Sequence, residues 1–197
     1  LAELGKQKRT FAVAFKDLKT GEELLINEHE SFHAASTMKT PVLIEAYRQA
    51  QDGRFTLTDS ITIKKTFKSI VDGTEYVLDQ TSDSDQEIYS KIGAKLTLHD
   101  LLYRMIIRSS NLATNLVIEV LGAENVNETM RRMGARDIQV RRGVEDTKAF
   151  QKGLNNTTTA KDLMIIFESI ASGNAVSAKA SEEMIKILLD QQFNTII

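Results

Sequence analysis

The sequence predicts an α+β fold in which a β-hairpin precedes a series of helices. Two apolar stretches near the N-terminus, Phe11–Phe15 and Glu23–Asn27, flank a polar turn that contains Gly21. Glycine readily takes the positive φ angles of tight turns, so residues 10–27 are predicted to form a β-hairpin. After position 36, apolar residues recur mainly at helical spacing. Strands followed by a run of helices are typical of α+β proteins.

Capping residues delimit the predicted helices. We expect residues 1–9 to be the end of a helix, and a long helix to run from about Ser36 to Gln51. Pro41 falls near the first turn of that helix, where a missing N–H costs little. Thr97 is a predicted N-cap. Further helices are expected at about 97–108, 111–121, 124–133, 159–172 and 177–191, with loops and short elements at 54–97 and a long surface loop at 140–156.

The composition argues against several classes of function. The chain has 197 residues, a net charge of −2, no cysteine and three histidines. The histidines are not spaced as a metal site, so we expect no metal, no cofactor and no nucleic-acid partner. No apolar run reaches the ~18 residues of a membrane-spanning helix, so no membrane span is expected.

The start of the long helix carries the first candidate for chemistry. Ser36 and Lys39 are three residues apart, which places them on one face of the helix. A lysine whose pKa is lowered by desolvation can take the proton of a serine hydroxyl. The alternative is an ordinary solvated first turn, because Ser-x-x-Lys is a loose pattern.

A second motif lies at Arg108–Asn115 and reads Arg-Ser-Ser-Asn-Leu-Ala-Thr-Asn. Alone it would be read as a helix cap and an inter-helix turn. Together with Ser36–Lys39 it resembles the class A β-lactamase and penicillin-binding family, whose boxes are Ser-x-x-Lys, Ser-Asp-Asn and Lys-Thr-Gly. Here the second box is Ser109-Ser110-Asn111, with Ser in place of the middle Asp. The stretches Ala34-Ala35, Asn156–Thr159 and Leu188–Gln192 also resemble class A enzymes.

The resemblance implies a helical subdomain packed on an antiparallel five-stranded sheet, with the active site between them. Residues 1–35 would supply a helix end and the hairpin, and residues 36–197 the helical subdomain. The sequence offers no convincing strand after residue 27 that would complete a sheet with the hairpin, and an isolated hairpin is marginally stable. We therefore expect the later strands, the third box and the terminal helix to come from a C-terminal segment or from a second chain that completes the sheet.

The resemblance also implies roles for individual residues. Ser36 would be the acylated nucleophile, Lys39 a base in acylation, and Ser109 the group that passes a proton to the leaving nitrogen. Asn111 and Ser110 would bind the substrate, and Asn111 would also orient Lys39. The Ser36 N–H would form half of an oxyanion hole.

The deacylation base is expected in the loop at 140–156. Class A enzymes use a loop glutamate there, aided by an asparagine four residues on. Glu145 is the only glutamate of this loop. If the family's spacing is counted back from Asn156, the position of the glutamate falls nearer to Gly143. If the alignment contains a small gap, Glu145 takes that position instead. Ala149 then stands where the asparagine would be.

Two features of the same loop leave alternatives open. Glu145 and Asp146 are equally well read as two solvated loop charges. In the family an Arg–Asp ion pair pins the loop; Arg141 or Arg142 is the expected cation, but the Asp position holds Asn156.

The resemblance implies a serine hydrolase, acylated at Ser36 by a β-lactam or a related amide or ester, and periplasmic or secreted. One alternative is a penicillin-binding or esterase-like protein that acylates but turns over slowly. Another is a non-catalytic member that binds a ligand or partner.

Overall fold

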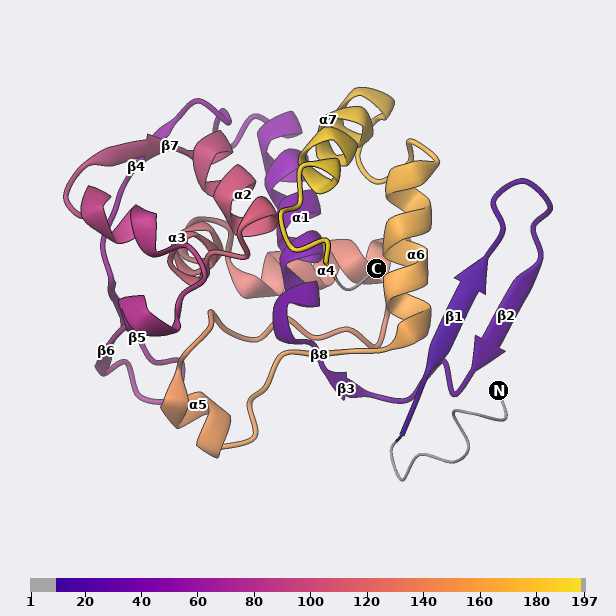
Figure 1. Ribbon diagram of the computed structural model, residues 1–197, viewed down its shortest axis with the longest axis horizontal. Coiled ribbons are helices and arrows are strands. Elements are labelled where there is room, and N and C mark those ends of the chain that lie inside the picture. Colours follow the sequence, from indigo (N-terminus) through magenta and orange to yellow (C-terminus); the bar gives the residue numbers. More distant parts are fainter. Residues whose placement is uncertain (1–9, 196–197) are drawn as a thin grey trace.

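The computed structural model describes residues 10–195, in which helices surround α1 and a β-hairpin lies at one side (Figure 1). Strands β1 (Val13–Lys16) and β2 (Glu23–Ile26) pair antiparallel, with Val13 opposite Ile26. This confirms the predicted hairpin. It packs on α6 (Ala160–Ala171), where Lys16 forms an ion pair with Glu168 at 2.8 Å. The helix expected within residues 1–9 lies outside the described residues.

The predicted long helices are confirmed, and most begin at a polar cap. Thr97 forms a capping box with Asp100, while Ser110, Thr159 and Ser177 cap the helices that follow them. Within residues 10–195 no helix is long and apolar enough to cross a membrane. The remaining helices are α1 (Lys39–Gln51), α2 (Leu98–Ile107), α3 (Asn111–Leu121), α4 (Ala123–Met133), α5 (Thr147–Gln151) and α7 (Ala178–Leu189).

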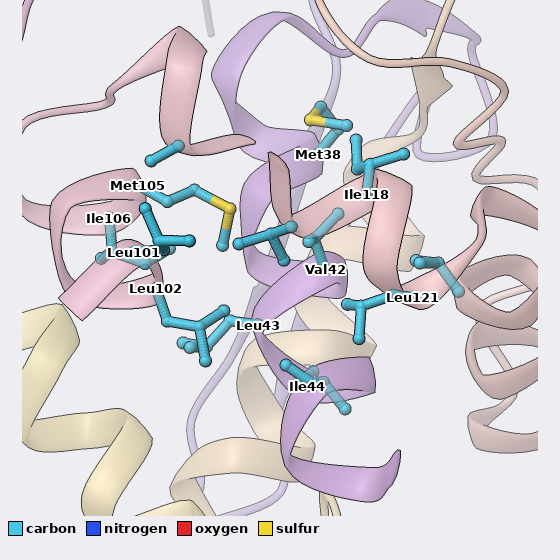
Figure 2. Close-up of a cluster of buried hydrophobic side chains, with 14 of the residues drawn as sticks. Met38, Val42, Leu43, Ile44, Leu101, Leu102, Met105, Ile106, Ile118 and Leu121 are labelled. Carbon is cyan, nitrogen blue, oxygen red and sulfur yellow. The ribbon is translucent and has the colours of Figure 1, made fainter. Parts of the chain in front are cut away.

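Helix α1 is the centre of the hydrophobic core. A 3₁₀ turn, Ala35–Met38, leads into it, and α2, α3, α4 and α7 pack around it. Figure 2 shows its apolar side chains between those of α2 and α3. Burying one large apolar side chain contributes about 1.5–3 kcal/mol, so this packing holds α1 firmly in place. The fully or almost fully buried side chains include Met38, Val42, Leu43, Ile44, Leu101, Leu102, Met105, Ile106, Ile118 and Leu121.

Within the described residues no strand after residue 27 joins the β1–β2 hairpin, as expected, but short strands that were not expected form elsewhere. Besides β1–β2, the described chain forms three more two-stranded antiparallel sheets. Their strands are two or three residues long, too short to show the alternation that identifies a strand in sequence. They are β3 (Phe32–His33) with β8 (Thr157–Thr158), β4 (Ser60–Thr62) with β7 (Lys95–Thr97), and β5 (Thr66–Lys68) with β6 (Glu75–Val77). The β3–β8 pair crosses the expected boundary at residue 35, and that domain division stays a prediction.

The segment 140–156 is more ordered than the expected surface loop. It contains α5, and it buries several polar residues that an exposed loop would leave in water. The reason is a set of long-range contacts that sequence periodicity does not reveal. Its buried members include Arg142, Asp146, Ala149 and Asn156.

Candidate active site

Ser36 and Lys39 meet Ser109 at the N-terminal end of α1. The Ser36 Oγ lies 2.8 Å from the Ser109 Oγ. The Lys39 Nζ donates to the Ser109 Oγ at 2.9 Å and to the Ser109 carbonyl at 2.5 Å. Ser36 is exposed, whereas Lys39 is 2% exposed. Within the described chain, Ser36 and Lys39 are therefore connected through the hydroxyl of Ser109.

The surroundings of Lys39 favour its neutral form. Burial lowers the pKa of Lys39 to about 8, while the negative charges of Asp83 and Glu145 oppose this shift. Part of the Lys39 population is therefore an uncharged amine near neutral pH, which a proton acceptor must be.

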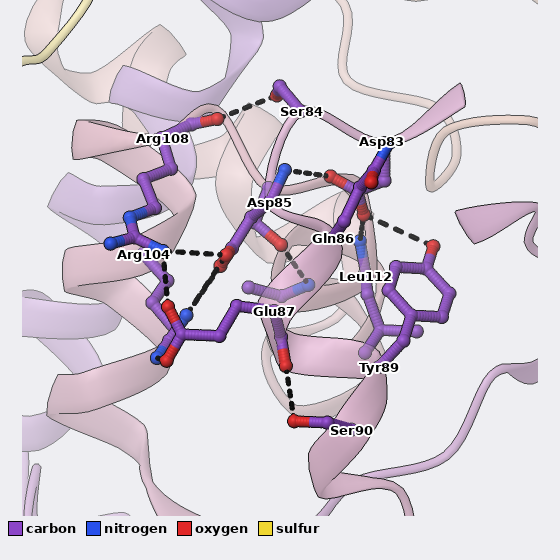
Figure 3. A network of polar contacts seen from close by, with 12 residues as sticks. Asp83, Ser84, Asp85, Gln86, Glu87, Tyr89, Ser90, Arg104, Arg108 and Leu112 are labelled. Carbon is purple, nitrogen blue, oxygen red and sulfur yellow. Dashed lines mark hydrogen bonds and ion pairs between the residues drawn. The ribbon is translucent and has the colours of Figure 1, made fainter. Parts of the chain in front are cut away.

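Ser109 lies at the sharp connection between α2 and α3, and a buried acidic segment holds this connection (Figure 3). The Asp83 carboxylate accepts from the N–H groups of Asn111 and Leu112, at 3.0 and 2.8 Å. Negative charge is stabilised at a helix N-terminus, so Asp83 anchors the start of α3. The Ser84 hydroxyl donates to the Arg108 carbonyl at 2.6 Å.

The neighbouring Asp85 ties the same segment to α2. Its carboxylate is 1% exposed and pairs with Arg104 at 2.8 Å and Arg108 at 3.2 Å (Figure 3). Removing one partner of such a buried pair is costly, because it leaves an uncompensated charge. The Asp83–Asp85 segment is a part of the site that sequence analysis missed; the only signal was a run of Ser and Asp.

Asn111 links Lys39 to the loop at 140–156. Its Oδ1 accepts from the Lys39 Nζ at 3.2 Å, and its Nδ2 donates to the Glu145 Oε1 at 2.9 Å. Glu145 also accepts from the Ser82 hydroxyl at 3.1 Å and from the Asp79 N–H at 3.4 Å. The structure thus brings Ser36, Lys39, Ser109, Asn111 and Glu145 into one connected set of contacts.

The interpretation of Glu145 and Asp146 as two solvated loop charges is wrong. Asp146 is 2% exposed and accepts from the Ser69 hydroxyl, the Ile70 N–H and the Ala149 N–H at 2.9–3.1 Å. Glu145 is partly buried, with the contacts described above. Ala149 is buried and brings no amide side chain to the position expected for the asparagine.

The loop is pinned by amide and carbonyl contacts in place of the expected Arg–Asp ion pair. Asn156 Oδ1 accepts from the N–H groups of Arg141 and Arg142 at 2.8 and 3.2 Å, and its Nδ2 donates to the Arg142 carbonyl at 3.0 Å. The Arg142 guanidinium donates to the carbonyls of Leu154 and Gly143, both at 3.0 Å. Arg142 is therefore the arginine that spans the loop.

Asn115 holds the residue before Glu145. Its Oδ1 accepts from the Val144 N–H at 2.6 Å, and its Nδ2 donates to the Val144 carbonyl at 3.0 Å. The absence of a side chain at Gly143 permits this approach, since a Cβ there would lie 2.4 Å from the Asn115 Oδ1. Sequence analysis did not single out Asn115, although its position four residues after Asn111 places both on one face of α3.

Three site residues hold a strained backbone. Within residues 10–195, the non-glycine residues with positive φ are Asn27, Ala35, Ser109 and Glu145, and the last three lie at this site. Such conformations cost about 1–3 kcal/mol each and persist only where surrounding contacts enforce them. The strained positions are thus two proposed site residues, Ser109 and Glu145, and the residue directly before Ser36.

Ser110 occupies a different environment from its neighbours. It is fully buried, and its hydroxyl accepts from the Ala113 N–H as the N-cap of α3. Contact of Ser110 with a substrate stays a prediction.

A pocket of about 390 Å³ opens beside Ser36. Its polar wall contains Ser36, Lys39 and Ser109, and its apolar wall includes Met105, Phe167 and Leu188. The Lys-Thr-Gly triplet of this chain, Lys19–Gly21, does not line it: this triplet lies in the exposed turn between β1 and β2. Among the residues described, no group of three or more His, Asp or Glu side chains is arranged to hold a metal ion.

The helical subdomain, the partial sheet and the Ser–Lys–Ser–Asn cluster define a protein of the β-lactamase and penicillin-binding fold. A sequence profile described as the Beta-lactamase enzyme family matches residues 1–197. The chain therefore belongs to this family.

Known relatives agree with this assignment. The β-lactamases CARB-3 and PSE-4 of Pseudomonas aeruginosa are each 22% identical over 186 residues, which cover 91% of this chain and 59% of each relative. The chain thus spans about three fifths of the length of these relatives. Among solved structures, the β-lactamase of Sphaerobacter thermophilus DSM 20745 is 28% identical, with a TM-score of 0.73 over 92% of this chain and 62% of that one. PBP-A is 24% identical, with a TM-score of 0.78 over 98% of this chain and 68% of that one.

Proposed function

We propose that this protein is a serine hydrolase in which Ser36 is acylated by a β-lactam, or by a related amide or ester, and the acyl-enzyme is then hydrolysed. The observation that carries the proposal is the contact sequence Ser36–Ser109–Lys39, which joins an exposed hydroxyl to a buried amine with a lowered pKa. By family resemblance, the protein is expected in the periplasm or outside the cell.

In acylation, the Ser36 Oγ attacks the carbonyl carbon of the substrate. Its proton passes by way of the Ser109 hydroxyl to the neutral amine of Lys39, along contacts of 2.8 and 2.9 Å. When the carbon–nitrogen bond breaks, Ser109 returns a proton to the leaving nitrogen and regains one from Lys39. The Ser36 N–H, by family resemblance, contributes one hydrogen bond to the oxyanion.

Asn111 is proposed to bind the substrate and to position Lys39. Its Oδ1 already accepts from Lys39, so the remaining polar group is the amide NH₂ that donates to Glu145. A carbonyl oxygen of the substrate side chain can accept from the same NH₂ group, which has two N–H bonds. Binding therefore need not displace Glu145.

Glu145 is the proposed base of deacylation. It would take a proton from a water molecule that attacks the acyl carbon, and return it to Ser36 as the ester breaks. Its contact with Asn111, which also contacts Lys39, supports this role, because it connects the carboxylate to the amine through one side chain.

A slow acyl-enzyme is the second candidate. Ala149 supplies no side-chain amide to hold the water, and Glu145 already accepts hydrogen bonds from Asn111, Ser82 and Asp79. Both features favour inefficient deacylation. A point mutant of PBP-A, which is 25% identical to this chain with a TM-score of 0.78, has been solved as an acyl-enzyme complex with penicillin G. A non-catalytic binding protein is the third candidate.

Reaction with nitrocefin separates the candidates. Steady turnover supports the hydrolase, and a stoichiometric burst that stalls supports the slow acyl-enzyme. The mass of the intact protein after reaction should rise by one acyl group, and Ser36→Ala should remove this adduct. Failure to form any adduct would leave the non-catalytic candidate, and an adduct on the Ser36→Ala variant would refute the nucleophile assignment.

A further inference from the structure

A second cavity lies behind the loop that carries Glu145. It has a volume of about 300 Å³, at the lower limit of ordinary ligand pockets. Its walls come from the β5–β6 hairpin, from α3 and the first residue of α4, and from the start of the loop at 140–156; Phe67, Tyr76 and Ile118 supply apolar surface. It shares no lining residue with the pocket beside Ser36.

Cations outnumber carboxylates among the side chains that line this cavity, and the buried Asp146 carboxylate lies nearby, bonded to the Ile70 N–H. Lys68, Arg141 and Arg142 line it, and in the part of the chain that the structure describes none of them forms an ion pair. The one carboxylate among the lining residues, Glu119, is already paired with Lys64 at 2.7 Å. Lys68 and Arg141 are exposed, so they are free to turn toward a ligand.

Arg142 is buried and forms no ion pair within the described residues; burial lowers its pKa, and the charge of the nearby Asp146 carboxylate only partly opposes this. It is 6% exposed, and it donates to the Leu154 carbonyl, the Gly143 carbonyl and the Asn155 Oδ1. A guanidinium has five N–H bonds. These three contacts leave two without an acceptor among residues 10–195. A buried charge whose contacts are all neutral dipoles is costly, and an anion beside it would lower that cost.

We propose that this cavity binds a small organic anion with an apolar body, of which an aryl carboxylate is the simplest case. The anionic group would lie among Lys68, Arg141 and Arg142. The ring would lie against Phe67 and Tyr76, whose own rings are 6.1 Å apart, and against Ile118. Neither charge nor apolar surface alone defines the ligand; their combination in one cavity does.

Occupancy of this cavity is expected to affect the loop. Tyr76, Asn115 and Gly143 line the cavity, and Asn115 holds Val144, the neighbour of Glu145. The Tyr76 hydroxyl also contacts the Asn115 Nδ2 at 3.2 Å. A ligand that immobilises these side chains would also restrict the motion of Glu145. This coupling rests on the proposed function, whereas the binding itself does not.

The binding is tested by ¹⁹F NMR titration of 4-(trifluoromethyl)benzoate with the full 197-residue chain. The neutral analogue 4-(trifluoromethyl)benzyl alcohol is the comparison ligand. We expect saturable binding of the benzoate at low millimolar concentration, weakened at high salt. Replacing both exposed cations, in Lys68→Gln/Arg141→Gln, should weaken the benzoate about tenfold and leave the alcohol unchanged.

The matched control is Lys95→Gln/Lys179→Gln, which removes two exposed cations that do not line the cavity and should leave binding unchanged. Benzoate bound by Lys39 instead would be insensitive to the Lys68 and Arg141 substitutions. The proposal is overturned if no saturable binding occurs, if the alcohol binds as well as the benzoate, or if the two double variants bind alike. These results are independent of nitrocefin turnover, so failure of the proposed reaction would not obscure them.

Discussion

The ammonium nitrogen of Lys39 lies 2.9 Å from the hydroxyl oxygen of Ser109, which itself lies 2.8 Å from the Ser36 hydroxyl. Two residues brought together by the start of α1 are thus connected through a third that lies 73 positions beyond Ser36 along the chain. The proposed reaction depends on this third hydroxyl.

Ser109→Ala should slow acylation by about 10²-fold or more, because it removes the group that relays the proton between Ser36 and Lys39. Stopped-flow measurement of the nitrocefin burst gives this rate. Ser90→Ala is the matched control, since it removes an exposed hydroxyl that contacts only the backbone carbonyl of Glu87. Equal rates for the two variants would contradict the relay.

The acylation rate should rise with pH and level off above pH 8, because the neutral amine of Lys39 is the base and its pKa is about 8.

The lowered pKa of Lys39 should also make the stability of the fold depend on pH. The ordinary pKa of lysine is 10.5, so between pH 8 and 10.5 the unfolded chain binds more protons than the folded one. The free energy of unfolding should therefore increase as the pH rises through this interval. Below pH 8 the folded protein lacks this extra stability. Rates measured across this range, with circular dichroism at each pH, test the prediction; a flat profile would refute it.

Glu145→Gln should leave the burst of nitrocefin acylation nearly intact and slow the decay of the acyl-enzyme by about 10²-fold or more. The lifetime of the adduct, followed by intact mass, reports this directly. Glu75→Gln, an exposed carboxylate on β6, is the control. If adducts on Glu145→Gln and on the unmodified protein decay equally fast, another group activates the water.

Asn115→Leu should destabilise the loop at 140–156, because the Val144 N–H loses its partner and the Val144 carbonyl keeps only the longer contact with the Tyr76 hydroxyl, at 3.4 Å. Leaving buried backbone groups unpaired costs about 1–3 kcal/mol. Amide hydrogen exchange should accelerate in this loop before it does in α1. In Asn125→Leu only a single contact with the Leu121 carbonyl is lost, so the exchange of the loop should be unaffected.

Gly143→Ala should disturb the site more than Gly73→Ala. At position 143 the added methyl group would lie 2.4 Å from the Asn115 Oδ1, and such overpacking costs about 1–3 kcal/mol. Gly73 has a φ of 72° but open space around it, so alanine there meets only backbone strain. Both variants should lower the melting temperature, and only Gly143→Ala should also lengthen the lifetime of the acyl-enzyme.

Much of the secondary structure was predictable from sequence because its signals are local. Helix α3 begins after the cap Ser110 and ends before Gly122, and both residues are visible within a dozen positions. The N-terminal hairpin was predictable for the same reason. Strands such as β3 and β8 were not, because two residues carry no periodicity and each strand is stabilised by a partner far along the chain.

The sequence by itself determined the hairpin, the long helices with their caps, and the pairing of a Ser-x-x-Lys turn with a Ser-Ser-Asn turn. Only the tertiary structure decided that Ser109 connects Ser36 to Lys39, that Asp83 anchors α3, and that Asp146 is buried against Ser69, 77 positions away. The physical reason is that capping and helical periodicity act within a few residues. Burial and the pKa of Lys39 depend instead on which distant segments exclude water from a given side chain.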